Sequence, residues 1–145
     1  MINSTIAKNR AGIPGGGGLS NHVCGSLFCG TIGQAGRVSI INSTIAENVA
    51  GDSFLSATEG GGIANFGGTL QIQNTVVARN VSSNASATVS DCAGTITSVG
   101  NNLIGDPSNC DISLQPSDLI GDPGLGALER TTRPEGRFIQ SWPRA

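Results

Sequence analysis

The chain has 145 residues and a net charge of −2, with 8 basic and 10 acidic residues. So few basic residues argue against a nucleic-acid-binding protein, and the length suits a single domain. Aromatic residues are scarce, with 4 Phe, 1 Trp and no Tyr. The aliphatic residues therefore have to fill the interior, which suits a narrow solenoid better than a thick globular core.

One short unit occurs three times along the chain. Residues 2–9 read INSTIAKN, residues 41–48 read INSTIAEN, and residues 73–80 read QNTVVARN. A glycine-led motif follows the first two copies, GGGLSN at 16–21 and GGGIAN at 60–65. Such self-similarity indicates one supersecondary unit stacked along an axis, with loops of different length on one side.

The units consist of runs of Ile, Val and Thr that are too short for helices, so we expect strands. In residues 69–73 (TLQIQ) the alternation predicts that Leu70 and Ile72 face inward and that Gln71 and Gln73 face outward. One unit is too short to bury its own apolar face, so neighbouring units have to stack.

Asparagine recurs at the turns of the repeat, and its side chain favours left-handed backbone. We expect left-handed conformations and side-chain hydrogen bonds between stacked units at Asn9, Asn48, Asn80, Asn21 and Asn65. Residues 23–36 have no counterpart after Asn65 and are predicted to be an insertion.

The pattern NSTIAxN followed by GGGIxNxGGTLxIxNT resembles the repeats of right-handed parallel β-helices in large bacterial surface proteins. These include polymorphic outer-membrane proteins and surface proteins with a choice-of-anchor domain. Residues 92–106 and 118–126 also resemble them. The resemblance implies an all-β, right-handed parallel β-helix of about four to five coils over residues 1–128. It also implies an extracellular or cell-surface location for the parent protein, although this chain shows neither a signal peptide nor a membrane span.

The last segment departs from the repeat. Residues 129–145 carry four Arg and two Glu, whereas residues 1–128 carry four basic and eight acidic residues. We expect an atypical basic tail that arises from a shifted reading frame or a vector, or else is an ordinary tail. Phe138, Ile139 and Trp142 would let this tail fold over an open end of the stack. Otherwise two chains would associate end to end, so a homo-oligomer is expected.

Four cysteines form two local pairs, Cys92 with Cys110 and Cys24 with Cys29. We expect a disulfide in each pair, which implies an oxidising compartment. For the second pair, metal binding is the alternative. With His22, the only histidine, Cys24 and Cys29 could hold zinc, and an open fourth position would give an ester or phosphoester hydrolase with His22 as a catalytic residue. The spacing matches no strong zinc signature.

A second small repeat, LIGDP, occupies residues 103–107 and 119–123. If these loops stack, Asp106 and Asp122 could form a catalytic pair for a carbohydrate substrate or bind calcium. Alternatively each Asp bonds its own backbone as turn chemistry.

The leading hypothesis is a non-enzymatic fragment of a β-helix protein with a structural or adhesive role, with surface glycans as possible ligands. It predicts no cofactor, and it treats Lys8, Glu47 and Arg79 as an outward row of charges. Its rivals are the zinc hydrolase of His22, Cys24 and Cys29 and the carbohydrate-active enzyme of Asp106 and Asp122.

Overall fold

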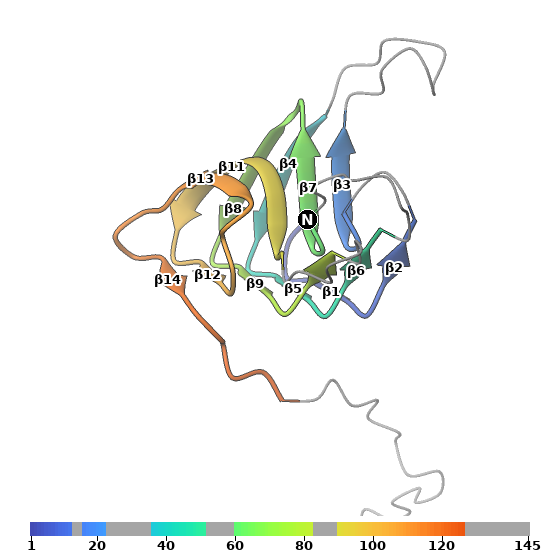
Figure 1. Ribbon diagram of the computed structural model, residues 1–145. Coiled ribbons are helices and arrows are strands. Elements are labelled where there is room, and N and C mark those ends of the chain that lie inside the picture. Colours follow the sequence, from blue (N-terminus) through green and yellow to red (C-terminus); the bar gives the residue numbers. More distant parts are fainter. Residues whose placement is uncertain (13–15, 23–35, 52–59, 83–89, 127–145) are drawn as a thin grey trace, which may run out of the picture.

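The computed structural model describes residues 1–12, 16–22, 36–51, 60–82 and 90–126. All regular elements in these ranges are β-strands, and the strands pair in parallel. Figure 1 shows that strands from successive passages of the chain lie side by side in a solenoid-like stack. The prediction of an all-β fold with stacked parallel strands is therefore confirmed. We call one passage through the stack a coil.

Three sheets make up the stack. The short sheet contains, in spatial order, β1 (Thr5–Ala7), β5 (Thr44–Ala46), β9 (Val76–Ala78), β12 (Leu103–Ile104) and β14 (Leu119–Ile120). The narrow sheet contains β2 (Arg10–Ala11), β6 (Val49–Ala50) and β10 (Val81–Ser82). The long sheet contains β3 (Leu19–His22), β4 (Arg37–Ile41), β7 (Ile63–Phe66), β8 (Thr69–Gln73), β11 (Cys92–Gly100) and β13 (Cys110–Ser113).

The long sheet shows where the predicted insertion leaves the stack. His22 at the end of β3 pairs with Phe66, and Arg37 at the start of β4 pairs with Thr69. The insertion 23–36 therefore stands where the neighbouring coil has only Gly67 and Gly68. Residues 23–35 lie outside the described ranges, but the register of the sheet is the same on both sides of them.

The core consists of columns of inward aliphatic side chains. In the short sheet Ile45, Val77 and Ile104 lie in register and are at most 1% exposed. In the long sheet Leu70 and Ile72 are equally buried. Each such side chain contributes about 1.5–3 kcal/mol on leaving water. The predicted alternation along residues 69–73 is confirmed, because Gln71 is exposed and Gln73 is only partly buried.

A ladder of buried amides connects the coils where the short sheet turns into the narrow sheet. The backbone N–H and Nδ2 of Asn9 both donate to Asn48 Oδ1, at 3.0 Å each. The same groups of Asn48 donate to Asn80 Oδ1, at 3.0 and 2.9 Å. Asn48 and Asn80 are fully buried, so these bonds supply the partners that a buried amide needs. The predicted bonding between stacked asparagines is confirmed here and for Asn21, whose Nδ2 donates to Asn65 Oδ1 at 2.9 Å.

The prediction of left-handed backbone at these five asparagines is wrong. The positive φ angles lie one residue earlier in the repeat, at Lys8 (57°), Glu47 (56°) and Arg79 (58°). They also occur at the other turn, at asparagines 3, 42, 74 and 101, which precede strands of the short sheet. The ladder asparagines keep ordinary backbone because their side chains have to point inward to meet the next coil.

We predict that Asn48→Ala lowers the free energy of unfolding by about 2–4 kcal/mol, since Asn9 and Asn80 then lose buried partners. Urea denaturation measures this loss. The matched control is Asn42→Gly, which removes an exposed amide that accepts from Asn74 Nδ2 and keeps the left-handed backbone. We expect that control to change stability by no more than about 0.5 kcal/mol. Equal losses in the two variants would contradict a stabilising role for the buried ladder.

Candidate functional site

The base of the insertion is held by Asn21, on β3. Its Nδ2 donates to the carbonyl of Gly36 (2.9 Å), and its Oδ1 accepts from the N–H of Gly36 (3.0 Å). One buried side chain thus joins the two places where the chain leaves and re-enters the long sheet. Next to it, the ring of His22 meets the ring of Phe66 edge-on, with centroids 5.7 Å apart. The sequence-predicted site residue His22 is therefore an exposed group at the foot of the insertion.

The proposed zinc partners of His22, Cys24 and Cys29, lie outside the described residues, as does the second disulfide predicted for them. Within the described ranges no group of three or more His, Cys, Asp or Glu side chains is placed to hold a metal ion. A zinc site at the insertion thus stays a prediction.

The predicted disulfide between Cys92 and Cys110 is confirmed. It joins the start of β11 to the start of β13, with Cα atoms 5.3 Å apart. Cys92 is buried in register with Ile63, and Cys110 is partly buried against the same core. A disulfide fits a protein from an oxidising compartment.

Asp106 and Asp122 follow β12 and β14, which pair with each other, yet their carboxylates engage different partners. Asp106 Oδ1 accepts from the N–H of Ser108 at 2.9 Å, and Asp122 Oδ1 accepts from the N–H of Gly124 at 3.0 Å. Both are the turn chemistry weighed as the alternative to catalysis. A catalytic or calcium-binding pair stays a prediction.

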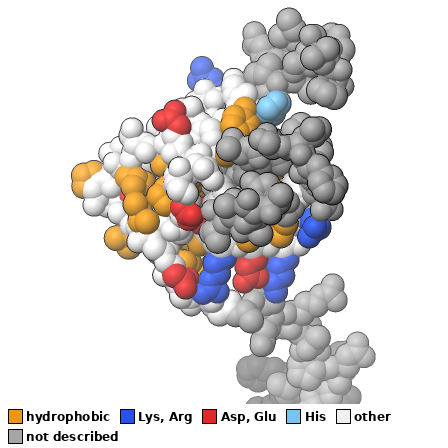
Figure 2. All heavy atoms as spheres, in the orientation of Figure 1, with side chains coloured by type: hydrophobic (Ala, Val, Ile, Leu, Met, Phe, Trp, Pro, Cys, Tyr) orange, Lys and Arg blue, Asp and Glu red, His pale blue; other side chains and the backbone are white. Residues whose placement is uncertain are grey.

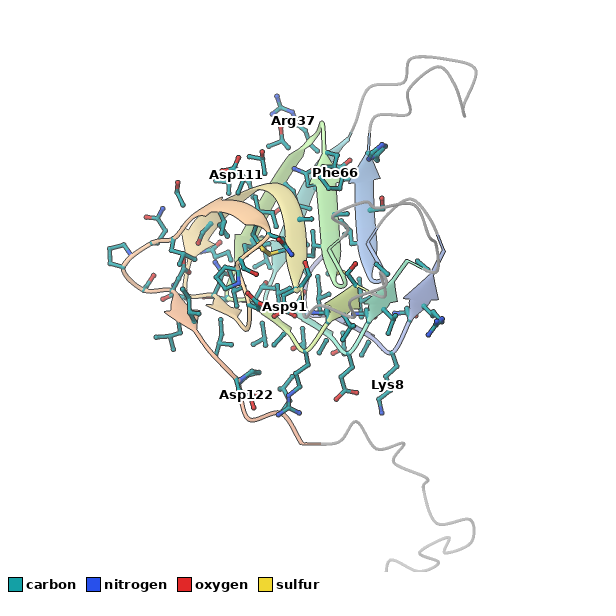
Figure 3. The ribbon with its side chains drawn as sticks, in the orientation of Figure 1. Lys8, Arg37, Phe66, Asp91, Asp111 and Asp122 are labelled. Atoms are coloured by element: carbon teal, nitrogen blue, oxygen red, sulfur yellow. A yellow bond between two sulfur atoms is a disulfide. The ribbon has the colours of Figure 1, made fainter. Side chains whose placement is uncertain are left out.

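Asp122 belongs to an outward row of charges along the short sheet. Its carboxylate pairs with Arg79 at 3.0 Å, and Lys8 pairs with Glu47 at 3.7 Å. Figure 3 places Lys8 and Asp122 along the same edge of the molecule, and Figure 2 shows basic and acidic side chains alternating there. The N–H of Gly124 and the Arg79 guanidinium lower the pKa of Asp122. Because these groups are exposed or, for Glu47, only partly buried, the row contributes little to stability.

The residue with the most unusual environment is Asp91, which the sequence did not single out. It is fully buried, and Figure 3 shows it in the middle of the stack. Asp91 Oδ1 accepts from the N–H and the Nδ2 of Asn80, at 2.8 and 2.9 Å. Asp91 Oδ2 accepts from the N–H of Asp106 at 2.7 Å. The carboxylate thus ends the amide ladder and binds the following turn.

Glycines explain why an acidic side chain fits at this position. Hydrogen bonds to the next coil align Gly18 with Gly62, and Gly62 with Asp91. A Cβ on Gly62 would lie 2.7 Å from the side chain of Asn80, which is too close. This position must therefore be glycine wherever a ladder asparagine packs against it. Beneath Asp91 the chain has Gly105, where a Cβ would lie 2.5 Å from Asp91 Oδ2. The sequence carries a signal for this. When residues 19–21 (LSN), 63–65 (IAN) and 92–94 (CAG) are aligned, the preceding residues are Gly18, Gly62 and Asp91.

Two carboxyls, the buried Asp91 and the partly buried Asp118, have pKa shifts of opposite sign. Burial raises the pKa of Asp91 above 3.8, against the hydrogen bonds from Asn80 and Asp106, and the nearby Asp106 carboxylate adds to the rise. Partial burial on its own would raise the pKa of Asp118 as well. Hydrogen bonds from Ser98 and from the N–H groups of Asn102 and Gln115 outweigh that effect, so the pKa of Asp118 is lowered.

The outer face of the long sheet is polar and mostly uncharged. Ser39, Gln71 and Thr97 lie in register across three coils, and Thr97 pairs with Ser113 in the next; all four are exposed. Phe66, 38% exposed, lies at the end of β7, in register with His22. Figure 3 shows Phe66 on the same side of the stack as Arg37 and Asp111.

Comparisons with protein-family models, curated proteins and solved structures gave no match. The resemblance to bacterial surface repeats therefore stays a prediction. Within the described ranges there is also no helix with the length and apolar character needed to cross a membrane.

We predict that Asp91 and Asp118 make the stability of the folded chain depend on pH in opposite directions. Because the folded-state pKa of Asp91 is raised, the folded chain binds the extra proton, and stability falls as pH rises from about 3.8 to that raised value. Because the folded-state pKa of Asp118 is lowered, stability falls as pH drops below about 3.8. Asp91→Asn should remove the first slope and Asp118→Asn the second, in urea denaturation measured from about pH 2 to 7.

The control for a general change of charge is Asp111→Asn, at an exposed carboxylate, which should leave both slopes in place. At neutral pH Asp91→Asn should also lose about 1–3 kcal/mol, because its amide must turn an NH2 group toward one of the N–H donors. An unchanged slope in either of the first two variants would contradict the assignment for that residue.

Proposed function

We propose that this chain is a segment of an exported, cell-surface right-handed parallel β-helix of about four to five coils, of the polymorphic outer-membrane or choice-of-anchor type, with a structural and adhesive role. The observation that carries the proposal is the use of the buried polar side chains. Asn48, Asn80 and Asp91 connect one coil to the next. Side chains used in this way make a stiff, regular support.

The structural part of the role also draws on the disulfide and on the insertion. The Cys92–Cys110 bridge fits an extracellular environment, where a stalk has to persist without cellular repair. Asn21 holds the two ends of the insertion against the long sheet. A stalk that holds both ends of an inserted segment suits a protein that presents contact surfaces away from a cell.

The adhesive part of the role falls on the outer face of the long sheet. Hydroxyl and amide groups at Ser39, Gln71 and Thr97 supply donors and acceptors at the regular spacing of neighbouring strands. Neutral glycans present hydroxyl groups on a similar scale, and the exposed ring of Phe66 offers an apolar surface for a sugar ring. We therefore propose neutral surface glycans as the ligand class.

We predict that the full chain binds neutral oligosaccharides on a glycan array and that Gln71→Ala combined with Thr97→Ala weakens this binding about tenfold, which corresponds to about 1.4 kcal/mol. Lys8→Gln, on the short sheet, is the matched control and should bind like the parent chain. Both variants are to be checked for unchanged thermal unfolding. An array with no bound glycan, or binding that the double variant leaves intact, would rule out this face.

The rival hydrolase of His22, Cys24 and Cys29 makes a different prediction, which metal analysis tests. On the structural proposal, the purified chain contains no stoichiometric zinc and shows no reactive thiols without reductant, because a disulfide removes the thiolate ligands. One zinc ion per chain, with hydrolysis of aryl or phosphate esters that His22→Ala abolishes, would establish the enzyme instead.

A further inference from the structure

Two Asp–Pro peptide bonds occupy the same place in the repeated LIGDP motif, Asp106–Pro107 after β12 and Asp122–Pro123 after β14. An Asp–Pro bond is sensitive to acid, because the proline nitrogen is a basic leaving group and the aspartate side chain can attack its own carbonyl carbon. The attack closes a five-membered ring, so a side chain held in position reacts much faster than a free one. The surroundings of each bond therefore decide whether it breaks.

The local turn is the same at both bonds. Asp106 Oδ1 accepts from the N–H of Ser108 at 2.9 Å, and Asp122 Oδ1 accepts from the N–H of Gly124 at 3.0 Å. A hydrogen bond from the residue two positions later folds the aspartate side chain over the Asp–Pro bond between them. Each carboxylate is thus held near the carbonyl carbon that it would attack, so the turns alone do not distinguish the two bonds.

A fully buried acid lies against the first bond. Asp91 Oδ2 accepts from the backbone N–H of Asp106 at 2.7 Å. A carboxyl oxygen therefore contacts the very residue whose carbonyl group forms the Asp–Pro bond. The carbonyl of Pro107 accepts from the N–H of Cys110 at 2.9 Å, which fixes the chain on the other side of the bond.

The two carboxyls at this bond favour different protonation states. Burial raises the pKa of Asp91 above 3.8, and the negative charge of Asp106 adds to the rise. Among the described residues the other side chain bonded to Asp91 is the neutral amide of Asn80, and the adjacent Cys92 is in a disulfide. In mild acid Asp91 thus holds a proton while Asp106 carries the charge. A proton donor beside a nucleophile is the pair that general acid catalysis needs.

The second bond has the opposite surroundings. Asp122 is exposed, and Nε and Nη2 of Arg79 both donate to its Oδ1, at 3.2 and 3.0 Å. This ion pair stabilises the carboxylate and so weakens it as a nucleophile. Within the described residues no carboxyl oxygen accepts from the N–H of Asp122 as Asp91 does from Asp106. Figure 3 shows the contrast, with Asp91 inside the stack and Asp122 at its edge.

We propose that the folded chain cleaves itself at the Asp106–Pro107 bond in mild acid, with Asp106 as the nucleophile and Asp91 as the proton donor. A side-chain oxygen of Asp106 attacks the carbonyl carbon of the same residue, and the bond from that carbon to the Pro107 nitrogen breaks. The electron pair goes to the nitrogen, which takes the proton of Asp91 and leaves as a prolyl amine. Asp106 is then a cyclic anhydride, and Asp91 is a carboxylate.

Water completes the reaction. One water molecule adds to the anhydride and opens it, which leaves Asp106 with a free α-carboxylate and its side-chain carboxylate. Of the two protons released, one returns to Asp91 and the other goes to the prolyl amine. The sum is the hydrolysis of one peptide bond, and both aspartate side chains recover their starting states.

The position of the bond determines what becomes of the products. It lies between Cys92 and Cys110, which form a disulfide, so residues 1–106 stay joined to the part from 107 onward. The strand pairs β11 with β13 and β12 with β14 also connect the two pieces. We expect the cleaved chain to stay in one piece until a reductant opens the disulfide. Separation of the pieces thus requires acid first and reduction second.

The test incubates the folded chain at several values from about pH 4 to about pH 7 and follows it by intact-mass spectrometry before and after reduction. We expect a species one water heavier than the parent, which reduction separates at Asp106–Pro107, and a rate that falls as pH rises. Cleavage at Asp122–Pro123 should be about 100-fold slower. In urea the contact with Asp91 is lost, so the preference for the first bond should disappear.

Three variants separate the roles of the residues. Asp106→Ala removes the nucleophile but keeps the N–H that Asp91 binds, so it should abolish cleavage without unfolding the chain, as thermal unfolding checks. Asp91→Asn should slow cleavage about 100-fold and remove its pH dependence, which a purely structural role of Asp91 would not do. Asp122→Ala is the matched control and should be cleaved like the parent chain.

Three results would overturn the proposal, and none of them requires Asp91→Asn to fold. The first is that no pieces separate on reduction after several weeks in mild acid. The second is that the two Asp–Pro bonds of the folded chain break at equal rates. The third is that cleavage persists in Asp106→Ala. Glycan binding does not enter this reaction, so each of these results leaves the adhesive role to be decided by the array.

Discussion

The hydrogen bond from one asparagine to the next is the interaction on which the stack depends. Parallel strands of only two or three residues supply few ladder bonds, and the narrow sheet could not hold its register alone. Asn48 and Asn80 fix the register of the narrow sheet, because each amide forms hydrogen bonds to both neighbouring coils in the interior. Burial makes the register strict, since a slipped coil would leave these amides without partners in a place that water does not reach.

The same dependence explains the construction around Asp91. Once a coil lacks the ladder asparagine, the amide of Asn80 still needs an acceptor, and a carboxylate from the neighbouring turn supplies it. An aspartate fits at position 91 because Gly105 has no Cβ that would collide with Asp91 Oδ2. The backbone N–H of Asp106 donates a hydrogen bond to that same oxygen. The adjacent Cys92–Cys110 bridge connects β11 covalently to β13. A buried acid and a disulfide thus connect these two coils, whereas asparagine side chains connect the other coils.

Much of this architecture was predictable from sequence because the repeat is local. The runs around Thr44, Thr69 and Val76 show their strand character and inward positions directly, and the spacing of Cys92 and Cys110 indicated their pairing. Asp91 was not predictable in the same way. Its role depends on Asn80, 11 residues earlier in the chain, and on Gly105 in the next coil, and only an alignment of the glycine-led motifs shows the acid in a glycine position.

The left-handed residues show a different limit of sequence reasoning. Asparagine favours that conformation, so the repeat suggested Asn48, yet the structure uses Glu47 and keeps Asn48 for the interior. Local preference was overridden by the need to satisfy a buried amide. Asp106 and Asp122 share a motif, and each accepts a hydrogen bond within its own turn, while a shared site for the two stays a prediction.

The junction between β3 and β4 has a consequence for sequence variation. Register with β7 and β8 is kept on both sides of it, although residues 23–36 stand there and only Gly67 and Gly68 stand in the neighbouring coil. The number of residues between β3 and β4 therefore does not affect the strand pairing of the stack. The strands keep their register on both sides, and Asn21 forms hydrogen bonds to Gly36, where the chain re-enters the sheet. Homologous proteins should therefore diverge fastest in length at this corner of each coil, and foreign peptides should be graftable there without loss of the fold.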